Sequence, residues 1–357
     1  MSKSIFITGS AGFIGSNFVM SLSNKQEFKN YKIISLDKLN YAGSKKNLSN
    51  LRQNTKHFFI KGDIANKYLL SKILKKYKPI YIINFAAETH VDRSIRKSTD
   101  FIKTNIVGTH ALLEIAKSYF DNLNNYKKKK FRFINVSTDE VYGSLKINEK
   151  PFKENNRLKP NSPYSASKAS SDLLARAWWK TYKFPVITTN CSNNYGPYQF
   201  PEKLIPLCIA NALKGKPLPI YGDGKQIRDW LHVSDHCNAI IQLIKKGKVG
   251  QSYNIGGSHE KTNISIVKKI CQVLDKIKPL KNGRTYKSQI QFVKDRPGHD
   301  FRYAVNSSKI KLELGWKPKE TFDSGIKKTV EWYLENFEWM EGVQNKEYKK
   351  WIKLQYK

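Results

Sequence analysis

A tyrosine and a lysine four residues apart, Tyr164 and Lys168, are the first pair in this sequence that could carry proton chemistry. Residues four apart lie on one face of a helix, and Pro163 is well suited to start that helix. An isolated tyrosine, with a pKa of about 10, is a poor base at neutral pH, but a neighbouring cation favours the phenolate. Because this spacing also occurs by chance on ordinary amphipathic helices, the pair gains meaning only from its context.

A second reactive group follows an apolar run that predicts a strand. The segment Asn135–Gly143 contains Thr138, Asp139 and Glu140 in succession. Elsewhere two adjacent carboxylates would indicate a solvated turn. At the carboxyl end of a strand, next to a tyrosine and a lysine, they add proton-transfer capacity beyond what a simple oxidation needs.

Glycines at the end of the first predicted strand indicate a phosphate site. Gly9, Gly12 and Gly15 are spaced by three where a strand passes into a helix. Glycines permit a tight turn and close backbone approach to a pyrophosphate, and the helix amino terminus favours its negative charge. The second strand ends at Asp37, and a carboxylate there can bind both ribose hydroxyls of NAD, although an Asp after a strand is also a common turn residue.

Apolar runs of strand length alternate with longer helical stretches through the first 200 residues or so, which predicts an α/β fold with a Rossmann-like, doubly wound parallel sheet. The predicted strands are Ser4–Thr8, Lys32–Asp37, Phe58–Lys61, Ile80–Phe85, Phe131–Ser137 and Val186–Asn190, and the predicted helices are Ile14–Ser23, Lys67–Tyr77, Phe101–Phe120 and Ser165–Tyr182.

Shorter elements punctuated by proline and glycine follow Pro201 and predict a smaller, mixed α/β substrate domain over the carboxyl edge of the sheet. We therefore expect an NAD-binding domain at 1–199 and a substrate domain with a basic tail at 200–357, with a segment near 229–255 returning to the first domain. The Lys- and Tyr-rich tail after Glu341 is compatible with a helix or with frayed chain.

The charge balance is strongly basic, with 64 Lys plus Arg against 29 Asp plus Glu, a formal net charge of +35. Specific nucleic-acid binding needs these charges gathered on one face, whereas here they are spread along the chain. The dense run Lys127–Lys130 is expected to be a solvated loop. We therefore expect a lysine-rich surface without a specific nucleic-acid site.

Four cysteines lie far apart, without the close pairs of a zinc site, so we expect no metal. No apolar stretch approaches the length of a membrane span, and no signal peptide is recognised. These features favour a cytoplasmic protein that does not bind membranes.

The glycine spacing resembles that of the extended short-chain dehydrogenase/reductase family. Longer motifs, in order along the chain, resemble its dTDP-glucose 4,6-dehydratase branch from the glycine turn to about Trp316. They are Phe85–Ser94, Thr104–Thr109, Ser192–Gln199, Arg228–Val233 and Asp295–Asp300. Two departures are visible: Thr89 stands where serine is more usual, and the basic tail has no recognised counterpart.

The resemblance implies dehydration of dTDP-glucose to dTDP-4-keto-6-deoxyglucose with NAD as a recycled catalyst. Tyr164, helped by Thr138, would take the O4 proton while hydride leaves C4. Glu140 would then remove the C5 proton that the new ketone acidifies. Asp139 would protonate the C6 hydroxyl so that water leaves, and hydride would return to C6.

The remaining candidates divide into two sets. The cofactor set is Gly9, Gly12, Phe13, Ile14, Gly15, Asp37, Lys38, Asn40, Asp63, Ile64, Ala86, Ala87, Thr104, Tyr164, Lys168 and Asn194. The substrate set is Glu88, Thr89, His90, Thr138, Asn193, Lys203, Leu204, Pro217, Pro219, Arg228, Asn263, Arg296, His299 and Tyr303. Arg228, Arg296 and Lys203 are included because cations suit a diphosphate.

Two alternatives remain open. One is a dehydratase or epimerase acting on a UDP-, CDP- or GDP-sugar, although Asp139 and Glu140 argue against a plain epimerase. The other is a basic, nucleic-acid-binding Rossmann protein without catalysis, which the retention of Tyr164, Lys168 and both carboxylates disfavours. The resemblance also implies a homodimer joined through Phe101–Phe120 and Ser165–Tyr182.

Overall fold

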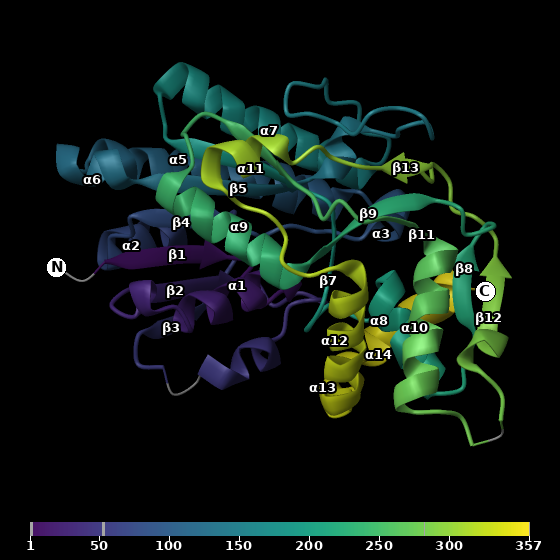
Figure 1. Cartoon of the computed structure of the whole chain (residues 1–357). Helices are drawn as coiled ribbons and strands as arrows, with labels where there is room; N and C mark the ends of the chain where they lie inside the picture. The colour runs from purple at the N-terminus through teal and green to yellow at the C-terminus, as the bar shows by residue number, and fades with distance from the viewer. Residues whose placement is uncertain (1–2, 52–53, 282, 357) are drawn as a thin grey trace.

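The structure, a computed structural model, describes residues 3–51, 54–281 and 283–356. Within these residues a sheet of seven parallel strands has the order β10-β6-β5-β4-β1-β2-β3, which confirms the predicted fold class (Figure 1). The order reverses between β1 and β4, where parallel sheets commonly bind nucleotides. The strands are β1 (Ser4–Thr8), β2 (Lys32–Asp37), β3 (His57–Lys61), β4 (Tyr81–Asn84), β5 (Arg132–Thr138), β6 (Val186–Cys191) and β10 (Ser252–Ile255).

Alternating side chains along each strand supply the two faces of this sheet. In β1, Ile5 and Ile7 pack into one core cluster, whereas Phe6 packs into the other. Residues Ile82 and Ile83 of β4 divide in the same way. This period-two pattern explains why the strands read as continuous apolar runs, since both faces are covered by helices.

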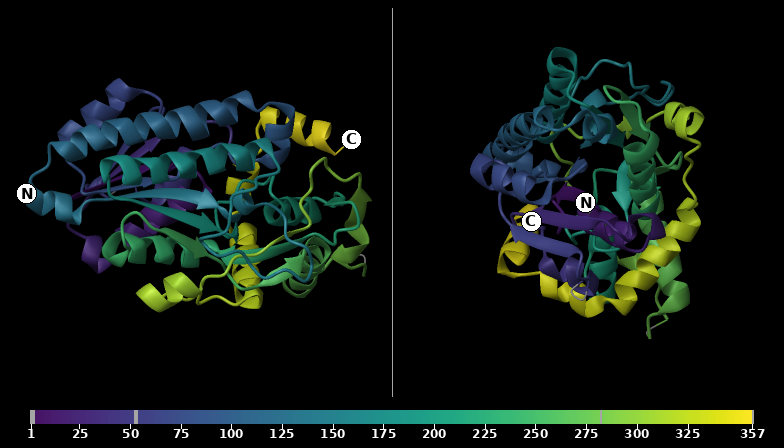
Figure 2. Two further views of the ribbon diagram at one scale, coloured as in Figure 1. Left: turned by 90° about the horizontal axis from the view of Figure 1, so that it is seen from above. Right: turned by 90° about the vertical axis from the view of Figure 1, so that its left-hand side faces the viewer.

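Helices cover both faces of the sheet, as the left panel of Figure 2 shows from above. Helices α1 (Phe13–Ser23) and α9 (Val233–Lys246) pack side by side on one face. Helices α2 (Lys67–Tyr77), α5 (Thr109–Asp121) and α7 (Pro163–Tyr182) pack on the other. Helix α7 begins at Pro163 as predicted, and Ser162 caps it through the Ser165 backbone N–H.

A smaller mixed region adjoins the carboxyl edge of the large sheet. Its apolar core joins α8, α10 and α12 to β8. Its strands are β7 (Asn193–Tyr195), β8 (Leu218–Tyr221), β9 (Ile227–His232), β11 (Glu260–Thr262), β12 (Ile290–Val293) and β13 (Arg302–Tyr303). Its helices are α8 (Leu204–Leu213), α10 (Asn263–Ile277), α12 (Phe322–Glu335), α13 (Phe337–Val343) and α14 (Lys346–Gln355).

The structure corrects two local predictions. The single helix expected over Phe101–Phe120 is α4 (Thr99–Phe101), a π-helical segment η3 (Ile102–Gly108) and α5. The run Lys127–Lys130, expected to be a loop, lies in the short helix α6 (Asn125–Lys130), which Asn124 caps. Capping of the first turn by the Asn124 side chain favours a helix there even though the run carries four like charges. The other short helices are α3 (Val91–Arg96) and α11 (Ser308–Leu314).

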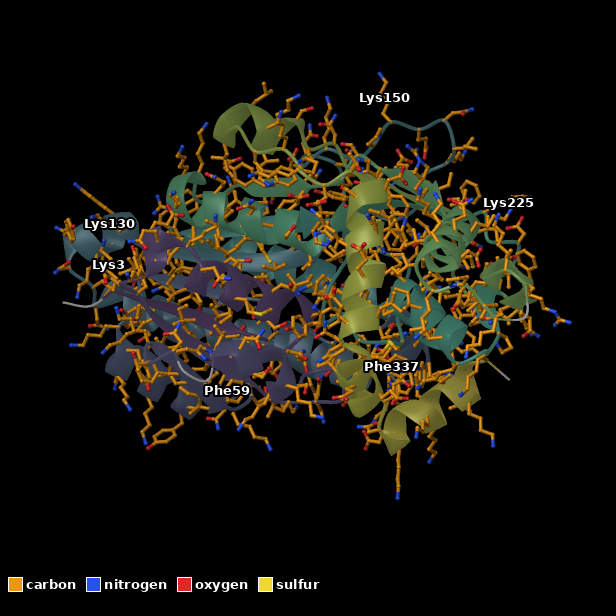
Figure 3. The ribbon with its side chains drawn as sticks, turned by 60° about the horizontal axis from the view of Figure 1, so that its bottom comes forward. Lys3, Phe59, Lys130, Lys150, Lys225 and Phe337 are labelled. Carbon is orange, nitrogen blue, oxygen red and sulfur yellow. The ribbon has the colours of Figure 1, made fainter. Side chains whose placement is uncertain are left out.

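The tail after Glu341 is ordered as the end of α13 and α14, and it lies against the rest of the molecule. Among the described residues, no helix is long and apolar enough to cross a membrane, and no cluster of side chains suits a metal ion. The labelled lysines Lys3 and Lys130 lie together at the left end of the molecule, whereas Lys150 lies at the top and Lys225 at the right (Figure 3). Positive charge is therefore dispersed over this view rather than gathered at one point.

Candidate active site

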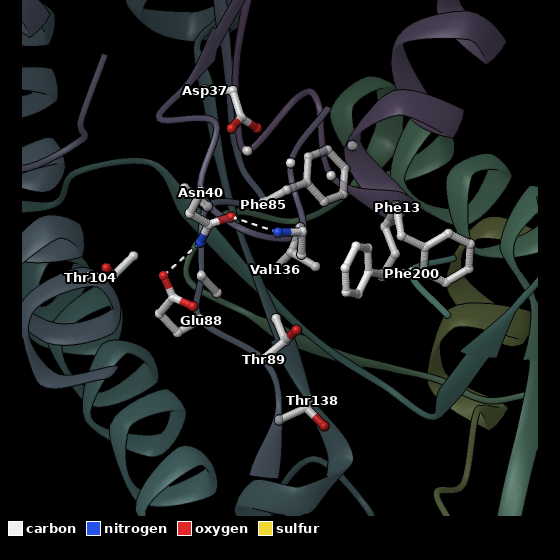
Figure 4. A pocket seen from close by; sticks show the side chains of 18 of the residues that line it. Phe13, Asp37, Asn40, Phe85, Glu88, Thr89, Thr104, Val136, Thr138 and Phe200 are labelled. Carbon is white, nitrogen blue, oxygen red and sulfur yellow. Dashed lines mark hydrogen bonds between the residues drawn. The ribbon is translucent and has the colours of Figure 1, made fainter. Parts of the chain in front are cut away.

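A cavity of about 270 Å³ lies over the carboxyl ends of β1, β2, β4 and β5. Every residue of the predicted cofactor set lines it, from the glycine turn to Asn194. The close view shows Asp37 and Asn40 on one side, Phe13 and Phe200 on another, and Thr138 beyond them (Figure 4). The sequence therefore identified residues that the fold brings to one place.

The glycine turn has the geometry that a dinucleotide needs. Gly9 has a φ of +66°, and a Cβ on it would stand 2.6 Å from the Ala86 backbone nitrogen. A Cβ on Gly15 would collide with the Gly9 carbonyl oxygen. Helix α1 starts just beyond Gly12, which has no side chain to occupy the first-turn N–H groups. These groups and the helix dipole suit a pyrophosphate.

Polar residues beyond β2 are held in position by one another. The Asp37 carboxylate accepts hydrogen bonds from the backbone N–H groups of Ala11 (2.9 Å) and Leu39 (2.7 Å), so it ties the glycine turn to β2. Lys38 pairs with Asp63 at 2.8 Å. The Asn40 side chain donates to Glu88 at 2.6 Å (Figure 4). Asp37 thus combines the turn role with a position on the cavity wall.

A second cavity of about 160 Å³ adjoins the first, and both include Glu140, Asn193, Asn194 and Lys203 in their linings. Most of the predicted substrate set faces one cavity or the other. The second is lined by His90, Glu140, Asn193, Lys203, Leu204, Pro219, Arg228, Asn263, Arg296, His299 and Tyr303. Glu88, Thr89 and Thr138 line the first.

Pro217 is an exception, because it is exposed and lines neither cavity. Its carbonyl oxygen accepts a hydrogen bond from the Asn211 side chain at 2.7 Å. The turn before β8 directs Pro217 outward, whereas Pro219, two residues later, reaches the second cavity. The prediction that Pro217 binds substrate receives no support from this position.

The tyrosine and lysine of α7 both face the first cavity beside Thr138. Lys168 Nζ donates to the Val136 carbonyl oxygen at 2.7 Å, which fixes the ammonium against β5. Burial raises the pKa of Tyr164 well above its usual value, and Glu140 adds to this rise, whereas a hydrogen bond with Thr138 opposes it. In the protein alone, burial therefore outweighs the predicted shift toward phenolate.

The two carboxyl groups occupy different environments. Asp139 is buried and lines neither cavity, and burial together with the neighbouring Glu140 charge raises its pKa well above the usual range. Burial also raises the pKa of Glu140, but Arg296, Arg228 and Lys203 oppose that rise. Asp139 is therefore the better proton donor of the two, and Glu140 the better base.

Three cationic side chains line the second cavity, and they differ in their hydrogen-bond and ion-pair partners. Arg228 is largely satisfied by backbone carbonyls, since its guanidinium donates to Ile227, Phe301 and Asp300. Arg296 Nη1 pairs with Asp92 at 2.9 Å. Lys203 Nζ donates to the Thr89 carbonyl oxygen at 2.8 Å.

Several polar atoms of the cavity walls are buried without a hydrogen-bond partner among the described residues. They are His90 Nδ1, Glu140 Oε2, Asn193 Oδ1, Trp230 Nε1 and Arg296 Nε. Buried polar groups are normally satisfied, so such atoms are the usual contacts of a polar ligand. Arg296 Nε is thus available to an anion even though Nη1 is engaged.

Sequence reasoning missed other residues that shape the cavities. Tyr41 and Phe200 line the first cavity, Tyr221 and Tyr356 the second, and Glu202 both. Glu202 pairs with Arg93 at 2.9 Å although it is almost fully buried. Phe200 directly follows the recognised motif Ser192–Gln199, whereas Tyr356 lies in the tail without a recognised counterpart. No local pattern indicated which aromatic residues would face a ligand.

The chain is similar to known dehydratases along most of its length. A family model described as GDP-mannose 4,6 dehydratase matches residues 6–329. A dTDP-glucose 4,6-dehydratase of Xanthomonas campestris pv. campestris is 53% identical over 343 residues, which cover 96% of each protein.

Solved structures are similar as well. A dTDP-glucose 4,6-dehydratase of Bacillus anthracis in complex with NAD is 48% identical, with a TM-score of 0.84 over 96% of this chain and 99% of that one. The enzyme of the same name from Streptomyces venezuelae, with NAD bound, is 42% identical, with a TM-score of 0.86 over 95% of this chain and 99% of that one.

Proposed function

The chain belongs to the family described as GDP-mannose 4,6 dehydratase, and from this premise we propose that it converts dTDP-glucose to dTDP-4-keto-6-deoxyglucose with NAD as cofactor. Its curated relatives at about half-identical sequence carry the name dTDP-glucose 4,6-dehydratase. One observation in the site carries the proposal: Glu140 lies where the two cavities meet, with Tyr164 and Thr138 on the cofactor side. A base there can reach a sugar held between the cavities.

The residues of the first cavity fit NAD. A Cβ on Gly9 or Gly15 would overlap neighbouring backbone, so the tight turn that lines this cavity needs glycine, and the Asp37 carboxylate on the cavity wall would bind the adenosine ribose. When bound, NAD accepts hydride from C4 of the sugar and later returns it to C6. Lys168, fixed by Val136, is in position to hold the nicotinamide ribose beside Tyr164.

Tyr164 would take the proton from the sugar O4, and Thr138 would hold that oxygen by a hydrogen bond. The raised pKa of Tyr164 disfavours the phenolate in the protein alone. The positive charge of the oxidised nicotinamide opposes this effect, since a cation at close range favours the charged phenolate. Proton removal from O4 is therefore coupled to the presence of the oxidised cofactor.

Glu140 would remove the C5 proton, which the new C4 ketone makes acidic. Its Oε2 is buried without a hydrogen-bond partner among the described residues, and Arg296, Arg228 and Lys203 favour its charged form. Burial raises the pKa of Asp139 and so favours its protonated form, which suits the proposed proton donor to the C6 hydroxyl. Because Asp139 lines neither cavity, this role requires its side chain to become accessible when the sugar is bound. This pair of roles distinguishes dehydration from epimerisation, which needs no second acid.

The experiment that tests this function is incubation of the purified protein with dTDP-, UDP-, CDP- and GDP-linked glucose, with mass analysis of the products. We expect loss of one water from dTDP-glucose and a slower reaction, or none, with the others. Dehydration of another nucleotide sugar in preference to dTDP-glucose would reject the proposed substrate, and recovery of a C4 epimer would reject the reaction.

We also propose that the protein is a homodimer. Apolar side chains are exposed on η3 and α7, the helices predicted to join the subunits: Ile102 is 49% exposed, Val107 51% and Leu173 55%. Because η3 and α7 pack against each other, these exposed side chains lie on neighbouring elements, and apolar side chains that gather in one patch favour a protein partner. Leu173→Lys should shift the mass measured by sedimentation from dimer to monomer, and a monomeric unaltered protein would reject the proposal. A cytoplasmic location likewise remains a proposal.

A further inference from the structure

We propose that Asp172 is the counter-charge of the buried Lys168 ammonium and thereby a positioning residue for the Tyr164–Lys168 pair. The inference rests on the proposed function, because it takes these two side chains to serve the oxidation at C4 of the sugar. Asp172 itself lines neither cavity, so it would act through Lys168 and not by contact with a ligand.

Asp172 lies on the same face of α7 as the reactive pair. Tyr164, Lys168 and Asp172 follow one another at intervals of four residues, and the helix continues through all three positions. All three side chains are buried, and α7 packs against β5 and β6. Side chains four residues apart are neighbours on a helix, so the Asp172 carboxylate and the Lys168 ammonium lie close enough to interact.

Two carboxamides of the large sheet hold the Asp172 carboxylate. The Asn135 side chain of β5 donates to Asp172 Oδ1 at 3.1 Å, and the Asn190 side chain of β6 donates to Oδ2 at 3.0 Å. The Asn190 amide nitrogen also donates to the Thr138 carbonyl oxygen at 3.3 Å. Two donors that converge on one side chain need a group that only accepts, and an ionised carboxylate is such a group.

The carboxamide of Asn135 is oriented from its other side as well. Its oxygen accepts a hydrogen bond from the Asn84 side chain of β4 at 3.4 Å. The Asn84 oxygen in turn accepts from the Thr8 hydroxyl of β1 at 2.7 Å. A row of buried polar side chains thus leads across the sheet from β1 to Asp172. Its donors point toward the carboxylate, so the network is built to receive a negative charge there.

Lys168 needs this charge because it is buried. Its Nζ donates to the Val136 carbonyl oxygen at 2.7 Å, a contact that fixes the ammonium but does not neutralise it. Burial lowers the pKa of Lys168, and Asp172 opposes that fall. Burial raises the pKa of Asp172 to about 6, and Lys168 opposes that rise. Each group therefore favours the charged form of the other near neutral pH.

Beyond the reactive tyrosine, the other titratable groups that face Lys168 and Asp172 are neutral near pH 7. Cys191 of β6 faces Lys168, and burial raises the pKa of its thiol to about 12. Tyr142, at the end of the short helix η4 (Asp139–Tyr142), faces Asp172, and burial raises the pKa of its hydroxyl. Among the described residues, Asp172 is therefore the anion that compensates the Lys168 ammonium.

The charge of Lys168 bears on the chemistry of Tyr164. A cation beside the phenol favours the phenolate that would take the O4 proton. An anion next to an ammonium raises the pKa of that ammonium, so removal of Asp172 should lower the pKa of Lys168. The protonated form of Lys168 would then be lost earlier as pH rises, and oxidation at C4 should fail at an alkaline pH that the unaltered protein tolerates.

The test is Asp172→Asn, which keeps the size of the side chain but removes its charge and one acceptor oxygen. Formation of reduced nicotinamide is measured in single turnovers of the NAD-loaded full-length protein with dTDP-glucose at increasing pH. The alkaline fall in rate should move to lower pH by about one unit or more, the usual effect of a neighbouring charge. The KM for dTDP-glucose and the NAD content should not change, because Asp172 lines neither cavity.

Two further variants separate a charge effect from damage to packing. Asn135→Asp combined with Asp172→Asn exchanges the two groups, so a donor again meets an acceptor and a negative charge remains in the network. This exchange should move the alkaline fall back toward that of the unaltered protein. Asp235→Asn is the matched control, since it removes a buried carboxylate of α9 that accepts from the Glu320 backbone N–H at 3.0 Å. Its pH profile should be unchanged.

Trace acetylation reads the charge of Lys168 without any turnover, because only the neutral amine reacts. The full-length protein is labelled as purified, and the acetylated fraction of Lys168 is compared by mass spectrometry with that of the exposed Lys153. Labelling of Lys168 at fixed pH should rise roughly tenfold in Asp172→Asn for a shift of about one pH unit, and the exchange variant should reverse this rise.

An alkaline fall at the same pH in Asp172→Asn, or unchanged labelling of Lys168, would overturn the counter-charge, even if the melting temperature decreases. If Asp172→Asn does not fold, labelling of the unaltered protein decides, because a Lys168 that is acetylated more readily than Lys153 at neutral pH is not held in its charged form. If the unaltered protein forms no reduced nicotinamide with dTDP-glucose, the proposed reaction fails, and the labelling still decides the role of Asp172.

Discussion

Replacing Glu140 by glutamine tests the division of labour in this site most sharply. Glutamine has almost the same size, so the junction of the cavities keeps its shape, but the group can no longer accept the C5 proton. Water loss should therefore slow by the usual contribution of a general base, about 10²–10⁴-fold, or about 3–5 kcal/mol in barrier.

The first half-reaction should survive for a reason visible in the structure. Glu140 is the second-largest contributor to the raised pKa of Tyr164, after burial. Removing its negative charge should lower that pKa, so proton removal from O4 should be no slower than in the unaltered enzyme. Lys168 and Thr138 keep their positions because neither depends on the Glu140 carboxylate; the Glu140 contact with Thr138 is through its backbone N–H.

Single-turnover mixing with dTDP-glucose is the assay. The near-ultraviolet absorbance of reduced nicotinamide should appear and persist in Glu140→Gln, with little 6-deoxy product and little solvent deuterium at C5. Glu338→Gln, an exposed change on α13, is the matched control and should behave as the unaltered enzyme. Normal dehydration by Glu140→Gln would identify another residue as the base, and loss of the absorbance signal in a folded, NAD-loaded variant would refute the separation of the two steps.

Three further predictions concern the cofactor and the response to acid. Tyr164→Phe should retain NAD but show no reduced nicotinamide on mixing with substrate, in contrast to Glu140→Gln. Denaturing the purified protein should release bound NAD. Gly9→Ala should abolish that release or prevent folding, because its Cβ would overlap the Ala86 backbone. A folded Gly9→Ala variant with full NAD content would contradict the assignment of the glycine turn to the cofactor site. Burial lowers the pKa of His236 to about 3. As pH falls below about 6.5, the unfolded chain therefore protonates this histidine before the folded protein does. The free energy of unfolding should then decrease between about pH 6.5 and pH 3, by up to about 1.4 kcal/mol per pH unit. Melting temperatures measured against pH should fall less steeply in His236→Asn, and an identical slope would show that this histidine does not contribute.

The sequence by itself determined the large sheet and indicated most of the residues that line the two cavities. Strands such as β1 and β2 were predicted with their observed bounds because both faces of a parallel sheet are buried and the chain reads as short apolar runs. Gly9 and Tyr164 could be assigned because their constraints are local: one needs a tight turn, the other a partner one helical turn away. The resemblance to known dehydratases then placed Glu140 in a reaction.

Only the tertiary structure decided how distant segments share the site. The sequence could not show that Asp139 is buried away from the cavities while its neighbour Glu140 lines both, because burial depends on what α7, β9 and the loop around Arg296 place around them. Nor could it show that Pro217 turns outward. The tail illustrates the same limit most clearly: the spacing of its aromatic residues predicts a docked helix face, but Trp351 meets His90 and Tyr356 meets Tyr221 across more than a hundred residues of chain. Contacts over such separations are fixed by packing of the whole molecule, and no local pattern encodes which surface a helix will meet.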